Sequence, residues 1–125
     1  MKLFVSIAFL AAAASSTALS AQAVESGYAR GTLAVAALER GDWTRAEQLL
    51  TARDLDQQDP ARLINLGRVY WATGREGEAL STWRRALASG RHFEVETLAG
   101  RVVSTETLAR EILSAHDTQV RSAAR

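Results

Sequence analysis

Residues 59–87 read DPARLINLGRVYWATGREGEALSTWRRAL and carry the clearest structural signal in the chain. Asp59 is a favourable N-cap and Pro60 suits the first helical position, so a helix is predicted to begin here. Small and apolar residues then recur at three- and four-residue steps as far as Gly74, which predicts one buried helical face. That face consists of Leu63, Leu66, Gly67 and Tyr70.

A second helix is predicted to return along the first, because small and apolar residues again recur with helical spacing. They are Ala79, Trp83, Ala86 and Leu87. Small residues at Gly67 and Ala79 let two helix backbones approach closely, and Tyr70 and Trp83 fill the volume beside that contact. We therefore predict an antiparallel helix pair over residues 60–90.

The same spacing recurs upstream, with one constant offset between matching residues. The residues related by this offset are Leu33 and Leu66, Gly41 and Gly74, and Ala46 and Ala79. An offset of this size is typical of stacked helix pairs, whose repeat period is roughly 34 residues. Gly41 is expected to end the first upstream helix as a left-handed C-terminal cap, and Asp42 is expected to cap the next one.

The downstream unit resembles a tetratricopeptide repeat at Leu66, Gly67, Tyr70, Gly74, Ala79, Trp83 and Ala86. The upstream unit is a weaker copy that keeps Leu33, Gly41 and Ala46, with Ala34 in place of the first glycine and Ala37 in place of the tyrosine. The resemblance covers residues 27–90. It implies a mainly all-α fold in which two tetratricopeptide-like helix pairs, residues 27–59 and 60–90, form a short right-handed solenoid.

The pattern changes after Gly90. Residues 92–98 alternate apolar and polar side chains, which predicts a strand rather than another helix. Gly100 supplies a turn before Arg101, so a short β-hairpin is expected. Such a hairpin is stable only when it packs on helices.

A last helix is predicted after the hairpin, with Ser104 or Thr105 as its N-cap. Its apolar face would be Leu108, Ile112 and Leu113. We expect it to reach about His116 and to cover the open end of the repeats as a capping helix. Residues 117–125 are polar and are expected to fray.

The N-terminus has the three regions of a secretory signal peptide. Lys2 gives a positive start, residues 3–14 are apolar, and residues 15–23 are small and polar and end in Ala21-Gln22-Ala23. The apolar run is shorter than the ~20 residues that a membrane-spanning helix needs. We expect cleavage after Ala23, with Ser20 as the second choice, and no membrane insertion of the mature chain.

The predicted organisation is a signal peptide over residues 1–23, helical repeats over residues 24–90, and the hairpin with the last helix over residues 91–125. A secreted chain without cysteine favours the bacterial periplasm. The lack of cysteine also removes disulfides, thiolate metal sites and cysteine nucleophiles.

The charge distribution argues against nucleic acid as a partner. Lys2 is the only lysine, so removal of residues 1–23 leaves 14 arginines against 14 acidic residues. The arginines are spread evenly from Arg30 to Arg125 and form no basic stripe, which is the feature that drives nucleic-acid binding.

No catalytic or metal-binding motif occurs in the sequence. His92 and His116 are far apart and lack metal-ligand spacing, so both are expected to be solvated, with His116 at a helix C-terminus. Glu94 and Glu96 share one side of a strand and are interpreted as a wet face. We expect no enzyme activity, no cofactor and no metal.

The resemblance also implies a binding surface, because in tetratricopeptide arrays the first helix of each unit lines a concave groove. In this chain those positions are Tyr28, Val35, Leu38, Ile64, Asn65, Arg68 and Trp71. Trp71 is the strongest candidate, since Tyr70 faces the interior and tryptophan and arginine are frequent interface anchors. The alternative is that Trp71 packs under the C-terminal helix. Asn65 resembles an asparagine that helps to hold a peptide's terminal carboxylate in chaperone-binding relatives, but the lysines of that clamp are missing.

The sequence therefore predicts a non-catalytic periplasmic adaptor that binds a peptide or a helix of a partner protein. The alternative is an accessory module of an envelope enzyme or assembly complex, with residues 91–116 as its working surface. Two repeats give little buried area, so self-association is predicted as well.

Overall fold

The computed structural model describes residue 28 and residues 31–125. The predicted signal peptide, residues 1–23, lies outside the described residues. The described chain is mainly helical, with one two-stranded antiparallel sheet, so that part of the fold prediction is confirmed. The elements are α2 (Val35–Glu39), α3 (Trp43–Leu50), α4 (Pro60–Ala72), α5 (Glu76–Ala88), β1 (Glu94–Glu96), β2 (Val102–Ser104) and α6 (Thr105–Ala123).

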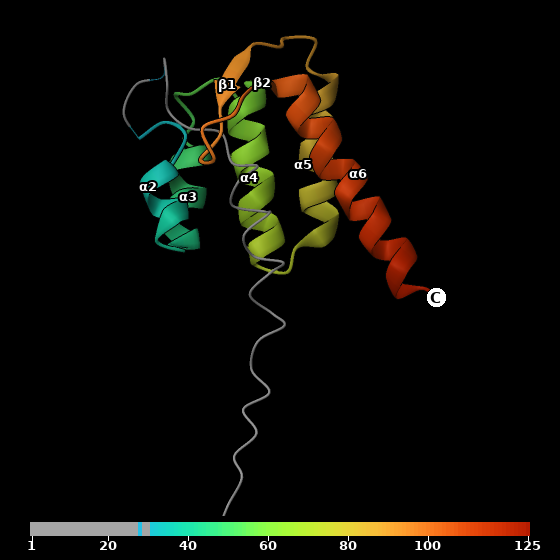
Figure 1. Cartoon of the computed structure of the whole chain (residues 1–125). Helices are drawn as coiled ribbons and strands as arrows, with labels where there is room; N and C mark the ends of the chain where they lie inside the picture. Colours follow the sequence, from blue (N-terminus) through green and yellow to red (C-terminus); the bar gives the residue numbers. More distant parts are fainter. Residues whose placement is uncertain (1–27, 29–30) are drawn as a thin grey trace, which may run out of the picture.

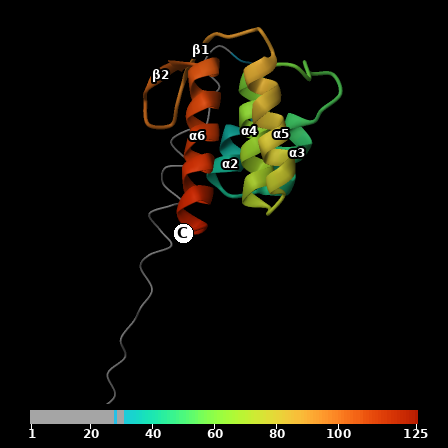
Figure 2. The same cartoon turned by 90° about the vertical axis from the view of Figure 1, so that its right-hand side faces the viewer.

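Helix α4 is the centre of the molecule. It packs most extensively against α5, α3 contacts it on another side, and α6 contacts both α5 and α4. Figures 1 and 2 show α6 on the opposite side of α4 from α3. In both views the hairpin lies at the end of the molecule where α4 and α6 begin.

The α4–α5 pair follows from its caps and from one close contact. The Asp59 side chain accepts a hydrogen bond from the Arg62 backbone N–H, and Pro60 is at the start of the helix, as predicted. Gly67 faces Trp83 across the pair, and the Trp83 indole donates to the Ile64 carbonyl at 3.1 Å. The missing side chain at Gly67 thus makes room for the indole.

The α2–α3 connection repeats this scheme. The Asp42 side chain accepts a hydrogen bond from the Arg45 backbone N–H at 3.1 Å, which makes it the predicted N-cap of α3. Gly41 and Gly74 occupy equivalent positions after α2 and α4, with φ values of 69° and 78°. Both glycines supply the left-handed conformation that ends a helix before a sharp turn.

Helix α2 is much shorter than the repeat predicts. It has five residues, and Leu33 and Ala34, expected within it, precede it. Ala34 adopts a left-handed conformation with φ 57°, a costly geometry for a residue with a side chain. Both residues are nevertheless buried. Leu33 and Ala34 therefore make the interior contacts that the repeat predicts, although they do not belong to the helix.

The hairpin and α6 complete the fold. Val95 pairs with Val103 in the antiparallel register, and the Ser104 side chain caps α6 by accepting from the Thr107 backbone N–H. The helix then runs to Ala123, past the end near His116 that the sequence predicts. An N-cap and a first-turn Glu106 favour this long helix, which continues through polar residues.

Two apolar clusters form the core. One joins α4 and α5 to the hairpin and α6 through Ile64, Ala86, Val95 and Leu108. The other joins α2 and α3 to α4; its buried members are Ala34, Ala37, Leu38, Ala46, Leu50, Leu66 and Val69. Helix α4 contributes to both clusters, so little of its surface is left exposed.

Candidate interaction surface

Three of the seven predicted groove residues lie in the interior. Leu38 and Ile64 are each 1% exposed, and Asn65 is fully buried. Their assignment to an open groove is therefore wrong. Ile64 is covered because the hairpin and α6 pack over the first turns of α4, and Leu38 because α2 packs against α3 and α4.

Asn65 has a structural partner of its own. Its side-chain Nδ2 donates to the Leu33 carbonyl at 2.9 Å, across the contact between α4 and the segment before α2. This bond satisfies a backbone acceptor next to the truncated start of α2. The expected role of Asn65 in holding a ligand carboxylate is not supported by this geometry, since the residue has no surface to offer.

Tyr28 and Val35 are partly buried and pack against the apolar cluster that joins α4 and α5 to the hairpin and α6. The Tyr28 hydroxyl donates to the Asp59 carboxylate, at 3.1 Å from each oxygen, and its ring lies 6.0 Å from that of Phe93. Burial and the adjacent Asp59 carboxylate both raise the pKa of the Tyr28 hydroxyl well above its usual range. Tyr28 therefore fastens the start of the described chain to α4 and the hairpin.

Trp71 packs under the C-terminal helix. Its ring lies 6.0 Å from that of Trp83 and 5.2 Å from the His116 ring, which meets it edge-on at 90°. The alternative interpretation of this residue is thus the one that the structure supports. Trp71 remains partly exposed.

His116 differs from its prediction in both position and exposure. It lies within α6 rather than at its end, and its side chain is 9% exposed. Its Nε2 is 2.8 Å from a carboxylate oxygen of Glu76, the first residue of α5, and its Nδ1 is buried without a hydrogen-bond partner among the described residues. His116 therefore attaches α6 to the helix pair beside Trp71.

Arg68 is the predicted groove residue with the most unusual environment. It is partly buried, and its guanidinium carbon lies 5.3 Å from the centre of the Trp43 ring. Its Nε–H is buried and has no hydrogen-bond acceptor among the described residues. Burial lowers the pKa of this guanidinium, and no carboxylate of the described residues opposes that effect.

Arg62 is a buried arginine whose charge is compensated by hydrogen bonds and by nearby carboxylates. Arg62 is 4% exposed, and its guanidinium donates to the carbonyls of Asp56 and Leu50. Burial also lowers the pKa of Arg62, but the carboxylates of Asp59, Asp56 and Asp54 act in the opposite direction. Arg68 lacks both kinds of partner in the described part of the chain.

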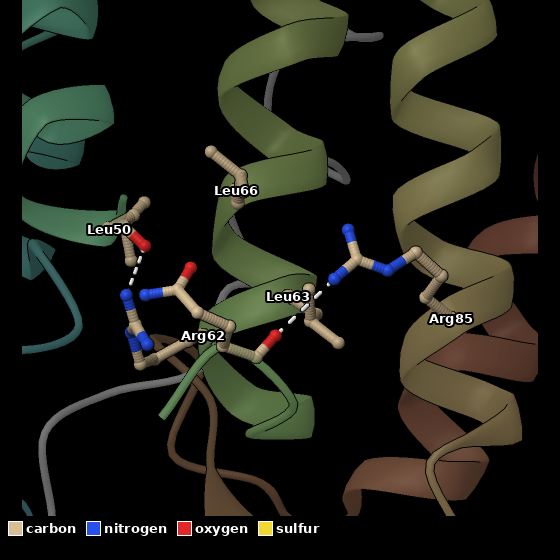
Figure 3. A pocket seen from close by; sticks show the side chains of 6 residues that line it. Leu50, Arg62, Leu63, Leu66 and Arg85 are labelled. Carbon is tan, nitrogen blue, oxygen red and sulfur yellow. Dashed lines mark hydrogen bonds between the residues drawn. The ribbon is translucent and has the colours of Figure 1, made fainter. Parts of the chain in front are cut away.

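A small pocket lies between α3, α4 and α5, on another side of α4 (Figure 3). Its lining residues are Leu50, Gln57, Arg62, Leu63, Leu66 and Arg85. Its volume is about 30 Å³, and Arg85 closes one side by donating to the Gln57 carbonyl at 3.4 Å. That volume suits one or two water molecules and not a substrate.

Within residue 28 and residues 31–125, no three histidine, aspartate or glutamate side chains gather closely enough to hold a metal ion. No helix in that part of the chain combines the length and the apolar character needed to span a bilayer.

Comparison with known proteins gives no assignment. No protein-family model matches the sequence, and neither the curated proteins nor the solved structures gave a match. The function is therefore inferred from the geometry alone.

The exposed part of α4 forms the candidate site. We define the Arg68 face as Arg68, Trp71 and Ala72 of α4 together with Trp43 of α3; all four are partly exposed. Trp43 and Arg68 belong to different helix pairs, and no spacing in the sequence relates the two residues. No spacing relates His116 to Trp71 either.

Proposed function

We propose that the chain is a non-catalytic protein-interaction adaptor that binds a segment of a partner protein at the Arg68 face. A stack of helix pairs is a rigid support for such a surface. Tryptophan and arginine together are also the residue types that most often carry binding energy at protein interfaces.

We also propose that the fold is a short solenoid of two tetratricopeptide-like pairs, α2–α3 and α4–α5, with α6 as the cap. The matching glycine caps after α2 and α4 support this, as does the close contact of Gly67 with Trp83. The outward side of α6 is polar, as a terminal helix requires. It carries Thr107, Arg110, Glu111, Ser114 and Thr118, all exposed.

One observation carries the functional proposal. Arg68 is a half-buried cation that has no carboxylate partner within the described chain, yet it lies on a partly exposed face beside two tryptophans. Leaving a desolvated charge unpaired is costly, so its retention on a surface is best explained by a partner that compensates it.

The second candidate function places the working surface in residues 91–116. It is favoured by Leu98 and Val102, which are 36% and 64% exposed and both belong to the hairpin region. Exposed apolar side chains on a short hairpin can anchor a partner. The Arg68 face ranks first because its exposed groups come from rigid helices.

Site-specific photo-crosslinking separates the two candidates. A benzoylphenylalanine at position 72, one helical turn beyond Arg68, should give a discrete adduct with a partner protein in the producing cells. The same probe at Ser81, which is exposed on α5, is the matched control. An adduct from a probe at Val102, with none from position 72, would favour the hairpin instead.

The periplasmic address and self-association are parts of the proposal with their own measurements. Mass spectrometry of the secreted chain should find Val24 as its first residue if the signal peptide is removed as predicted. Light scattering of that species should give a mass above that of one chain. A monomer with native helicity would remove self-association from the proposal and leave the adaptor function.

A further inference from the structure

Arg68 lies on the part of the α4 surface between the contact of α4 with the segment before α2 and its contact with α6. Along α4 it lies three residues after Asn65, whose side chain reaches the Leu33 carbonyl next to α2, and three before Trp71, which contacts His116 of α6. Residues three and four apart share a helix face, so Arg68 and Ala72 lie between these two contacts. In Figure 1, α2 lies beyond α3 on one side of α4, and α6 lies beyond α5 on the other.

The guanidinium is oriented by its surroundings. Its Nε–H is buried, and its central carbon lies over the Trp43 ring, 5.3 Å from the ring centre, a favourable contact between a cation and an aromatic face. No hydrogen bond or ion pair within the described residues uses its two terminal Nη groups. Two parallel N–H donors held in one plane match the two oxygens of a carboxylate.

Several other arginines of the described chain, such as Arg40, Arg45 and Arg84, also have no carboxylate partner, but they are exposed. Arg68 differs from them because it is partly buried. Arg75, Arg91 and Arg101 each bind a carboxylate, on Glu47, Asp56 and Glu111 respectively. Those three guanidiniums are more exposed to solvent and have less need of compensation. Arg68 is the more desolvated group, so a carboxylate supplied from outside gains more there.

The source of the carboxylate is a side chain rather than a chain terminus. Capture of a C-terminal carboxylate uses several converging donors, commonly backbone N–H groups. Asn65, the nearest polar side chain one turn earlier on α4, already donates to Leu33 and is fully buried. A single planar guanidinium framed by Trp43 suits one side-chain carboxylate with an apolar neighbour.

We propose that the two Nη groups of Arg68 bind the side-chain carboxylate of an aspartate or glutamate in a partner segment that crosses α4 between α2 and α6. This inference rests on the adaptor function and names the chemistry that its partner must present. Residues beside that carboxylate would lie over Trp43 and Trp71.

The test is an NMR titration of the full secreted chain with two small probes. Nα-acetyl-aspartic acid amide presents the side-chain carboxylate, and Nα-acetyl-asparagine amide is its neutral match. The aspartate probe should shift the Arg68 Nε–H and Trp43 indole signals with a dissociation constant on the order of tens of millimolar, as expected for one ion pair in water. The asparagine probe should leave both signals in place.

Three variants and one further probe make the result specific. The variant Arg68→Gln should abolish the shift of the Trp43 indole, while Arg84→Gln, on an exposed part of α5, should leave it unchanged. Arg68→Lys should weaken binding severalfold, because a lysine keeps the charge and loses the paired donors. Nα-acetyl-alanine, which has a free terminal carboxylate, should bind more weakly than the aspartate probe.

Equal shifts with the aspartate and asparagine probes, or a shift that survives Arg68→Gln, would overturn the inference. Tighter binding of Nα-acetyl-alanine would overturn the choice of a side-chain carboxylate. The adaptor function is tested separately by the photo-crosslinking experiment. It would be contradicted if the benzoylphenylalanine at position 72 gave no more adduct than the one at position 81. If the adduct forms equally well with Arg68→Gln, the adaptor function stands and the carboxylate inference is lost.

Discussion

The indole of Trp83 occupies the space that a side chain on residue 67 would need. A Cβ placed on Gly67 would lie 2.3 Å from Trp83 Nε1 and 2.5 Å from its Cδ1, far inside normal contact distance. The same Nε1 donates to the Ile64 carbonyl at 3.1 Å. The contact between α4 and α5 therefore depends on a glycine and a tryptophan together.

Replacing Gly67 with alanine should destabilise the protein by about 1–3 kcal/mol, since the indole must shift and its hydrogen bond must weaken. Urea unfolding followed by circular dichroism measures the change. In a Trp83→Phe background, which lacks Nε1, the same substitution should cost less. An equal cost in both backgrounds would show that the two residues are not coupled.

Gly74 and Gly77 should respond to alanine in opposite directions. Gly74 has φ 78°, so Gly74→Ala should cost about 1 kcal/mol of stability. Gly77 lies in the first turn of α5 with open space around its Cβ position, and Gly77→Ala should stabilise by about 0.5 kcal/mol. Thermal unfolding of the two variants, side by side with the parent chain, tests the difference in sign.

The ion pair between Glu47 and Arg75 should make stability depend on pH. The hydrogen bonds from Arg75 hold the pKa of the Glu47 carboxyl below its ordinary value of 4.5. A carboxyl whose pKa is lower in the folded state stabilises the fold fully above its unfolded pKa, and this contribution is lost as the pH falls through the folded pKa.

Glu47→Gln should therefore lower stability modestly at pH 7, and the difference from the parent chain should shrink below about pH 4.5. Urea unfolding at several pH values measures it. Gln48→Ala, at an exposed position beside Glu47, is the control and should show no such trend. If the difference in unfolding free energy between Glu47→Gln and the parent chain stays constant down to pH 3, the Glu47–Arg75 ion pair is not the source of the pH dependence.

His116 should control how firmly the second half of α6 is attached. His116→Ala removes the contact with Trp71 and the hydrogen bond to Glu76, which together contribute about 1 kcal/mol or more. Amide hydrogen exchange over residues 113–123 should speed up severalfold, while exchange in α4 and α5 stays unchanged. Gln119→Ala, exposed on the same helix, is the matched control. Unchanged exchange would show that α6 is held elsewhere.

The local parts of the fold were predictable because the residues that fix them lie close together in the sequence. Asp42 and Asp59 cap their helices through side chains that reach a backbone N–H three residues on, and Ser104 does the same for α6. The mainly helical character and the short hairpin were likewise predictable, because both follow from the spacing of apolar residues a few positions apart in the sequence. The repeat solenoid stays a prediction.

The errors arise where distant segments meet. Leu33 and Ala34 have a helical spacing, yet they precede α2, because the segment packs beside the hairpin and Asn65 binds its carbonyl. Nothing in the sequence near Leu33 indicates a hydrogen-bond partner as far along the chain as Asn65. Ile64 and Asn65 were wrongly assigned to an open groove because the segments that cover them are also distant in the sequence.

The candidate site was predictable only in part. Arg68 and Trp71 were named as groove residues from the resemblance to tetratricopeptide repeats, and both are partly exposed. Their actual neighbours, Trp43 and His116, come from α3 and α6 and have no sequence spacing that links them to α4. Arg68 is distinguished by burial without a hydrogen-bond or ion-pair partner among the described residues. That combination arises only in the folded chain and leaves no pattern in the sequence.

The polar outer side of α6 also constrains how this protein can evolve. A duplicated helix pair appended after Arg125 would meet Arg110 and Glu111, each already engaged in an ion pair and each unsuited to burial. In the solenoid that we propose, gene duplication would instead have to insert new helix pairs upstream of the hairpin. On that proposal, longer homologues are expected to share the hairpin with α6 and to differ in the number of helix pairs before it.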